Sequence, residues 1–113
     1  MEKKAQAYSI KLKTRDRIVL LGLVSGPGSV TQQRTVRAIL ERVGFSDEEQ
    51  ERLKFREIAG GGGQQWDAAA DRAVGYEFSA VERALIVRRL QDLNEKEEVQ
   101  QFHLPLWDAF VGE

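Results

Sequence analysis

Four consecutive glycines stand beside a tryptophan in AGGGGQQW, residues 59–66. Consecutive backbone N–H groups in a glycine run can form a concavity that binds a phosphate. A phosphate-binding loop also needs a strand before it, a helix after it and usually a Lys with a Ser or Thr, whereas Gln-Gln-Trp follows here. We therefore interpret the segment as the tip of a β-hairpin. A contact of Gly61, Gly62 and Trp66 with a ligand or partner is the alternative interpretation.

Groups that could carry out catalysis are scarce. The chain has one histidine, His103, and no cysteine. It therefore has no thiolate nucleophile, no thiolate metal site and no disulfide. The acidic residues are numerous, but their spacing singles out no pair for acid–base chemistry. We interpret His103 as a structural or surface residue, and we expect a non-enzymatic protein with no catalytic residue, no metal and no cofactor.

Basic residues are the main candidates for binding. The first 17 residues hold six Lys and Arg against two acidic residues, although the net charge of the whole chain is −1. Arg89 falls on the apolar stripe of an expected helix, where an arginine snorkels, pairs with a carboxylate or faces a ligand. The candidate residues for contact with a ligand or partner are Lys13, Arg15, Arg17, Arg34, Arg37, Gly61, Gly62, Trp66, Arg89 and Trp107.

The C-terminal sequence FHLPLWDAF, residues 102–110, gathers aromatic and aliphatic side chains around Trp107. Such a segment can dock on the core of its own chain, or it can lie in the groove of a partner. It can also cover a second copy of the chain in a homo-oligomer. We take docking on its own core as the default.

Length and composition indicate an ordinary globular protein. The chain has 113 residues, of which 42% are hydrophobic and 31% are charged. These values predict a single domain over residues 1–113, with residues 1–7 as a flexible N-terminus. The longest apolar run, IVLLGLV, is too short to span a bilayer. We therefore expect a cytoplasmic protein without membrane contact.

The N-terminal part of the chain predicts a strand and then a helix. In YSIKLKT, residues 8–14, Tyr8, Ile10 and Leu12 alternate with polar residues, which is typical of a half-buried strand. Thr14 is expected to cap a helix formed by RIVLLGLV and buried on most sides. A buried strand is the rival interpretation of that run, because β-branched residues and a glycine weaken a helix.

The rest of the chain predicts mainly helices. After a turn at SGPGS, apolar residues spaced i, i+3, i+4 and i+7 indicate an amphipathic helix over 31–43, capped by Thr31 and followed by Gly44 at the C′ position. Short extended runs flank the glycines, and GYEF suggests another strand. A last helix is expected over about 104–111. Capping boxes predict helices over 47–53 and about 80–96: Ser46 with Glu49, and Ser79 with Glu82.

This order of elements predicts an α+β fold, a helix-dominated compact single domain with a short β-hairpin or small sheet. Three helices followed by a hairpin also allow a winged-helix-like arrangement. In that topology the third helix would enter the DNA groove, and here that helix is the acidic DEEQERL. Because phosphates repel acidic side chains, the sequence argues against DNA binding.

Four stretches carry a resemblance: TRDRIVLLGLV, TVRAILERVGFSDEEQERLKF, YEFSAVERALIVRRLQDLNEKEEV and HLPLWDAFV. Together they span roughly residues 14–111 and resemble a group of small phage-encoded or phage-like proteins of no established function. The resemblance implies a phage accessory protein acting in the cytoplasm of an infected bacterium. Such proteins commonly block a host enzyme, divert a host factor or sequester a signal of host defence. No functional residue is carried over.

The leading hypothesis is therefore a phage-type binding protein that inhibits or sequesters a host protein or a defence-signalling nucleotide. Nucleotide sequestration would need arginines from several elements to converge in one pocket, at a subunit interface of a homo-oligomer. Two alternatives stay open. One is a winged-helix DNA-binding regulator with a continuous basic face, and the other is a structural or assembly adaptor.

Overall fold

The computed structural model describes residues 7–57 and 64–112. Most of the N-terminal segment expected to be flexible, residues 1–6, lies outside the described residues, and Ala7 already belongs to the first strand. The glycines Gly61 and Gly62 also lie outside them. Among the described residues, no helix combines the length and the apolar character needed to cross a membrane.

The first strand pairs with a strand far along the chain. β1 (Ala7–Leu12) runs antiparallel to β4 (Val74–Ser79), with Tyr8 opposite Phe78. Leu12 and Phe78 are buried, and the alternating residues Ser9 and Lys11 are exposed, which confirms the predicted alternation. This ribbon presents one apolar face to the helices, as expected for a sheet covered on one side.

The next two helices begin one residue or more away from the predicted positions. α1 (Thr14–Val24) has Lys13 at its N-cap, so the prediction that Thr14 caps it is wrong. Instead, the Thr14 N–H and hydroxyl donate to Asp71 Oδ1 at 3.0 and 2.6 Å. The carboxylate of Asp71, from a distant part of the chain, thus satisfies a backbone N–H at the start of α1 that a local capping side chain would otherwise satisfy.

α2 (Val30–Val43) likewise begins before the predicted Thr31. The cap is Ser29, whose hydroxyl accepts from Gln32 N–H at 3.1 Å while the Gln32 side chain accepts from Ser29 N–H at 2.9 Å. Gly44 ends the helix with φ −61°, so it does not adopt the left-handed conformation expected of a C′ glycine.

A side lobe follows α2. It consists of residues 45–57 and 64–73, with α3 (Asp47–Leu53), β2 (Arg56–Glu57), β3 (Gln64–Gln65) and the short 3₁₀ helix η1 (Ala68–Ala70). The capping box of Ser46 and Glu49 is confirmed. β2 pairs with β3, which confirms that a hairpin flanks the glycines.

The C-terminal half supplies the remaining helices. α4 (Ala80–Glu95) opens with the predicted capping box of Ser79 and Glu82. The expected last helix is a succession of a 3₁₀ turn, an α turn and a π turn: η2 (Gln101–His103), α5 (Leu104–Leu106) and η3 (Trp107–Val111).

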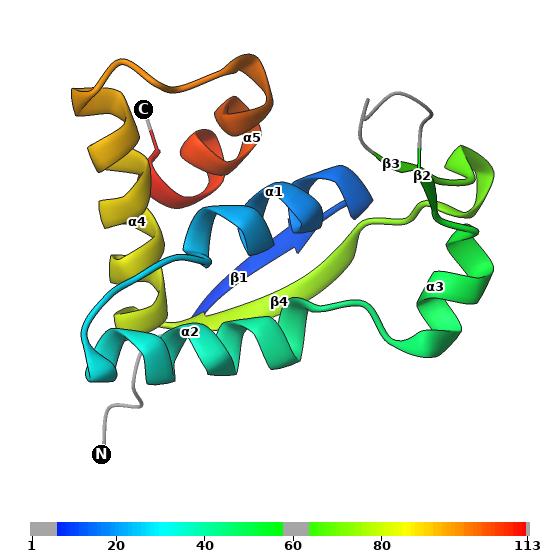
Figure 1. Ribbon diagram of the computed structural model, residues 1–113, viewed down its shortest axis with the longest axis horizontal. Coiled ribbons are helices and arrows are strands. Elements are labelled where there is room, and N and C mark those ends of the chain that lie inside the picture. The colour runs from blue at the N-terminus through cyan, green and yellow to red at the C-terminus, as the bar shows by residue number, and fades with distance from the viewer. Residues whose placement is uncertain (1–6, 58–63, 113) are drawn as a thin grey trace.

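The helices outside the side lobe and the β1–β4 ribbon form a body, and the side lobe extends from one end of it (Figure 1). In the body, α1, α2, α4 and the C-terminal segment pack with the β1–β4 ribbon, and Phe78 contacts Phe110 with ring centroids 5.1 Å apart. The hairpin forms a sheet of its own, separate from β1 and β4. The prediction of a helix-dominated α+β domain with small sheets is confirmed.

Candidate binding groove

α1 is apolar on nearly all of its sides, but the body covers only part of it. Leu20 and Val24 are fully buried in the core, whereas Ile18, Val19 and Leu23 are half-buried. A helix that is apolar all round is normally buried all round. The prediction that this helix is buried on most sides therefore holds for the side that carries Leu20 and Val24. It does not hold for the side that carries Ile18, Val19 and Leu23, which stays partly uncovered.

The uncovered side of α1 forms the floor of a groove of about 660 Å³. Gly22 lies in this floor together with the half-buried aliphatic residues. Leu93 of α4 with Phe102 and His103 of η2 line it from the C-terminal part of the chain, and Trp66 lines it from the side lobe. Figure 1 shows α1 running between these two parts of the molecule.

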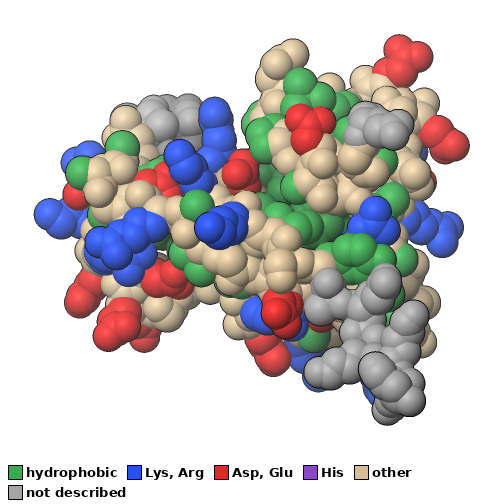
Figure 2. Space-filling model, turned by 180° about the vertical axis from the view of Figure 1, so that it is seen from behind, with side chains coloured by type: hydrophobic (Ala, Val, Ile, Leu, Met, Phe, Trp, Pro, Cys, Tyr) green, Lys and Arg blue, Asp and Glu red, His purple; other side chains and the backbone are tan. Residues whose placement is uncertain are grey.

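Hydrophobic side chains are also visible at the molecular surface. In Figure 2, they gather in a hollow near the middle of the molecule, below the C-terminal segment. Phe102 and Leu104 of that segment remain 37% and 41% exposed. Exposed apolar surface of this kind, next to a groove, marks a place where soluble proteins bind partners or ligands.

Asp71 holds Trp66 beside α1. Its Oδ2 accepts from Trp66 Nε1 at 3.4 Å, while its Oδ1 accepts from Thr14 at the start of α1. Burial raises the pKa of Asp71, but the hydrogen bonds from Thr14 and Trp66 outweigh burial and hold that pKa below its usual value. The Trp66 ring also packs edge-on against Phe55, with centroids 6.1 Å apart.

His103 closes the opposite wall. Its Nδ1 accepts from the Gln100 N–H at 2.9 Å, and its ring lies 4.5 Å from that of Phe102. Burial lowers the pKa of His103, because a buried site disfavours the charged imidazolium. The hydrogen bond from Gln100 agrees with the structural role predicted for His103. The structure also places His103 in the wall of the groove.

Arg17 faces the interior, with 2% of its surface exposed. Its guanidinium donates to both oxygens of Glu49 at 2.8 and 3.0 Å, and to the carbonyls of Val43 and Gly44 at 2.9 to 3.1 Å. It also stacks on Phe45, 3.9 Å from the ring centroid. The expectation that Arg17 contacts a ligand or partner is corrected: the group is buried and joins α1 to α2 and α3.

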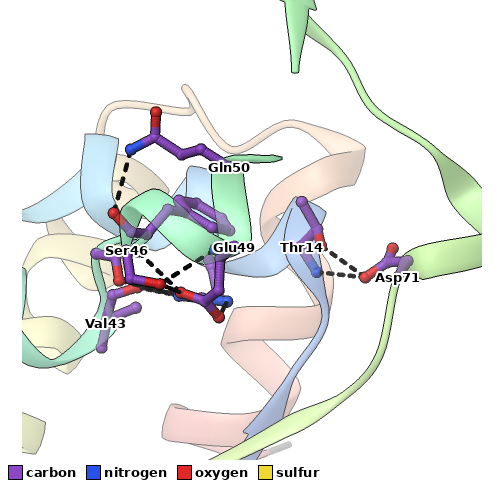
Figure 3. A network of polar contacts seen from close by, with 9 residues as sticks. Thr14, Val43, Ser46, Glu49, Gln50 and Asp71 are labelled. Atoms are coloured by element: carbon purple, nitrogen blue, oxygen red, sulfur yellow. Dashed lines mark hydrogen bonds and ion pairs between the residues drawn. The ribbon is translucent and has the colours of Figure 1, made fainter. Parts of the chain in front are cut away.

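Glu49 completes this polar junction, which Figure 3 shows together with Thr14 and Asp71. Its carboxylate accepts from Arg17 and from the Ser46 N–H. The hydrogen bond from Arg17 lowers the pKa of Glu49 to about 2, against the opposing effect of burial. The position of Arg17, three residues before Leu20 and seven before Val24, was the available signal that it faces the core.

The other predicted residues lie on separate surfaces. Arg34 and Arg37 are exposed on α2, and Lys13 is exposed at the start of α1. Arg89 is half-buried, with Nη2 3.5 Å from the Pro27 carbonyl, so this contact is with a backbone carbonyl and not with the carboxylate considered for it. Trp107 packs against the core, the default expected for it.

Of the described candidates, Arg15 and Trp66 line the groove. The sequence analysis did not identify the aliphatic floor, because it predicted that Ile18, Val19 and Leu23 belong to a helix buried on most sides. The available signal was a helix apolar on all sides that contains a glycine. Among the described residues, no group of three or more His, Asp or Glu is placed to hold a metal ion.

Comparison of the chain with models of protein families, with curated proteins and with solved structures finds no match. The groove must therefore be interpreted from its own chemistry.

Proposed function

We propose that this protein is a non-enzymatic, phage-type binding protein that inhibits or sequesters a host component held in the groove over α1. The observation that carries the proposal is the uncovered apolar side of α1, with Ile18, Val19 and Leu23 only half-buried. Covering apolar surface contributes about 25 cal/mol per Å², so a matching apolar surface would bind here.

The chemistry of the groove supports a partner with an apolar surface more than a nucleotide. The floor is aliphatic, and a cation, Arg15, lines the groove beside it. Arg34 and Arg37 lie on α2, whereas Arg89 lies on α4 and donates to the Pro27 carbonyl. These arginines therefore belong to different elements. Sequestration of a nucleotide would need a second copy of the chain to bring arginines together.

The test is binding of the apolar fluorescent probe anilinonaphthalene sulfonate, whose sulfonate can pair with Arg15. We expect saturable binding to the folded protein, weakened at least about tenfold by Gly22→Phe, which fills the groove from its floor. Gly22→Ala is the matched control and should keep most of the binding. No binding to the wild type, or equal binding to both variants, would refute the proposal.

A further inference from the structure

Among the described residues, nothing in the chain itself explains why position 22 of α1 is a glycine. Gly22 lies inside a regular helix, where glycine is less favourable than alanine. A Cβ atom placed on Gly22 would meet nothing within 4 Å, so no neighbouring element requires a glycine there. The residue instead forms part of the floor of the groove. A glycine in this position lets the main chain of another molecule approach α1 closely.

Arg15 is the one Lys, Arg, Asp or Glu among the described residues that line the groove, and acidic residues lie near Leu93 in the sequence. Arg15 and Trp66 both line the groove, and Trp66 also lines two neighbouring hollows together with Arg56, Lys54 and Asp67. Leu93 lines the groove as well, and its carbonyl accepts from the Glu98 N–H at 2.8 Å. The segment around it, residues 92–98, carries four acidic residues and one lysine. A bound segment is therefore expected in one direction.

We infer that the groove binds an amphipathic α-helix of a partner protein, which crosses α1 at Gly22. Its apolar face lies on Ile18, Val19 and Leu23. Its acidic end lies at Arg15 and its basic end lies near the end of α4. This inference rests on the proposed function and specifies the chemistry of the partner. Laying an amphipathic helix in an apolar groove is a common mode of recognition.

The helices of this chain make poor occupants for the groove of a second copy. The large hydrophobic residues exposed on α2 and α4 are Val30, Leu40 and Val81, in the part of the chain that the structure describes. Val30 and Leu40 are ten residues apart and do not share a helix face. A partner helix with a continuous apolar stripe fits the groove better than these isolated side chains.

The experiment is selection from a displayed library of amphipathic helices of about 15 residues, with charges randomised at both ends. We expect enrichment of peptides that carry acidic residues at one end and basic residues at the other. For such a peptide, Arg15→Glu should weaken binding at least about tenfold, since attraction becomes repulsion. Arg34→Glu, the same charge change on the exposed face of α2, should leave binding unchanged.

Substitutions at Gly22 test the crossing point. Binding of the selected peptides should fall from glycine to alanine to leucine, while the protein stays folded. Peptide binding that is indifferent to Gly22→Leu, or to Arg15→Glu, would overturn the inference. So would selection of no binders, or a stable homodimer by native mass spectrometry that Gly22→Leu dissociates, since the occupant would then be a second copy.

The two proposals fail in different ways. If the fluorescent probe binds in the groove but no oriented helix is selected, the inference fails and the binding function stands. If neither the probe nor a peptide responds to Gly22→Phe, the groove itself is not a binding site.

Discussion

The body and the side lobe are held together by different forces. Among the described residues, the body has a core of twelve buried hydrophobic residues contributed by β1, β4 and the main helices. Of the described residues of the side lobe, Leu53 alone is a buried hydrophobic residue, and it lies outside that core. The lobe depends instead on the contacts of Arg17 with Glu49 and of Thr14 with Asp71, and on aromatic edges among Phe45, Phe55 and Trp66.

This difference matters because the groove spans the junction. Its floor on α1 and the wall formed by α4 and η2 belong to the body, and Trp66 belongs to the side lobe. Hydrogen bonds weaken steeply as their distance and angle depart from the optimum. The position of Trp66 in the groove therefore depends in part on polar contacts that single substitutions can remove.

The largest effect is expected in the body. Phe110 is 1% exposed and packs against Phe78, so Phe110→Ala would leave a cavity in the core. The free energy of unfolding should fall by about 4 kcal/mol, as measured by chemical denaturation. Phe55→Ala, in the half-buried aromatic contacts of the lobe, is the comparison and should cost clearly less. Equal losses would show that the lobe shares the core of the body.

Arg17→Leu should have the next largest effect. The change removes the hydrogen bonds that Arg17 donates to the Glu49 carboxylate and the Val43 carbonyl, and breaking a buried ion pair from one side costs about 3 kcal/mol. Hydrogen exchange should speed up most in residues 45–57. The control is Arg15→Leu on the exposed side of the same helix, which should change stability little. Protection that falls evenly over the whole chain would argue against a junction specific to the lobe.

Acid should loosen the side lobe before the body. The folded pKa of Glu49 is lowered from 4.5 to about 2, so its contribution to stability is complete above pH 4.5 and is lost as the pH falls toward 2. The lowered pKa of Asp71 acts in the same direction. Tryptophan fluorescence during acid titration should report the change at Trp66.

Glu49→Gln should flatten that pH dependence between pH 4.5 and about 2, since the titrating group is gone. Glu48→Gln, an exposed neighbour on α3, is the matched control and should leave the acid transition in place. An unchanged transition in Glu49→Gln would assign the acid sensitivity to another group.

The smallest effect concerns the floor of the groove. Gly22→Ala should raise the free energy of unfolding by about 0.5–1 kcal/mol, because alanine is the better helix former and its methyl group meets nothing. Thermal unfolding measures the gain. A loss of stability would mean that the backbone at Gly22 is held by packing in the free protein.

Local patterns along the chain determined most of the elements. The alternation of Ile10 and Leu12 with lysines specified β1, and the pairs Ser46–Glu49 and Ser79–Glu82 specified the starts of α3 and α4. These features could be predicted because the groups that interact lie within one or two turns of each other. The helix-dominated α+β class followed from their order.

Only the tertiary structure decided what each element does. Thr14 and Asp71 are 57 residues apart, and Arg17 and Glu49 are 32 residues apart, so no local period places them together. The pairing of β1 with β4, and not with the hairpin, likewise depends on packing across the chain. The sequence shows that α1 is apolar on nearly all of its sides. Which side stays uncovered depends on how far the other elements extend over it, and that is a property of the packed molecule alone.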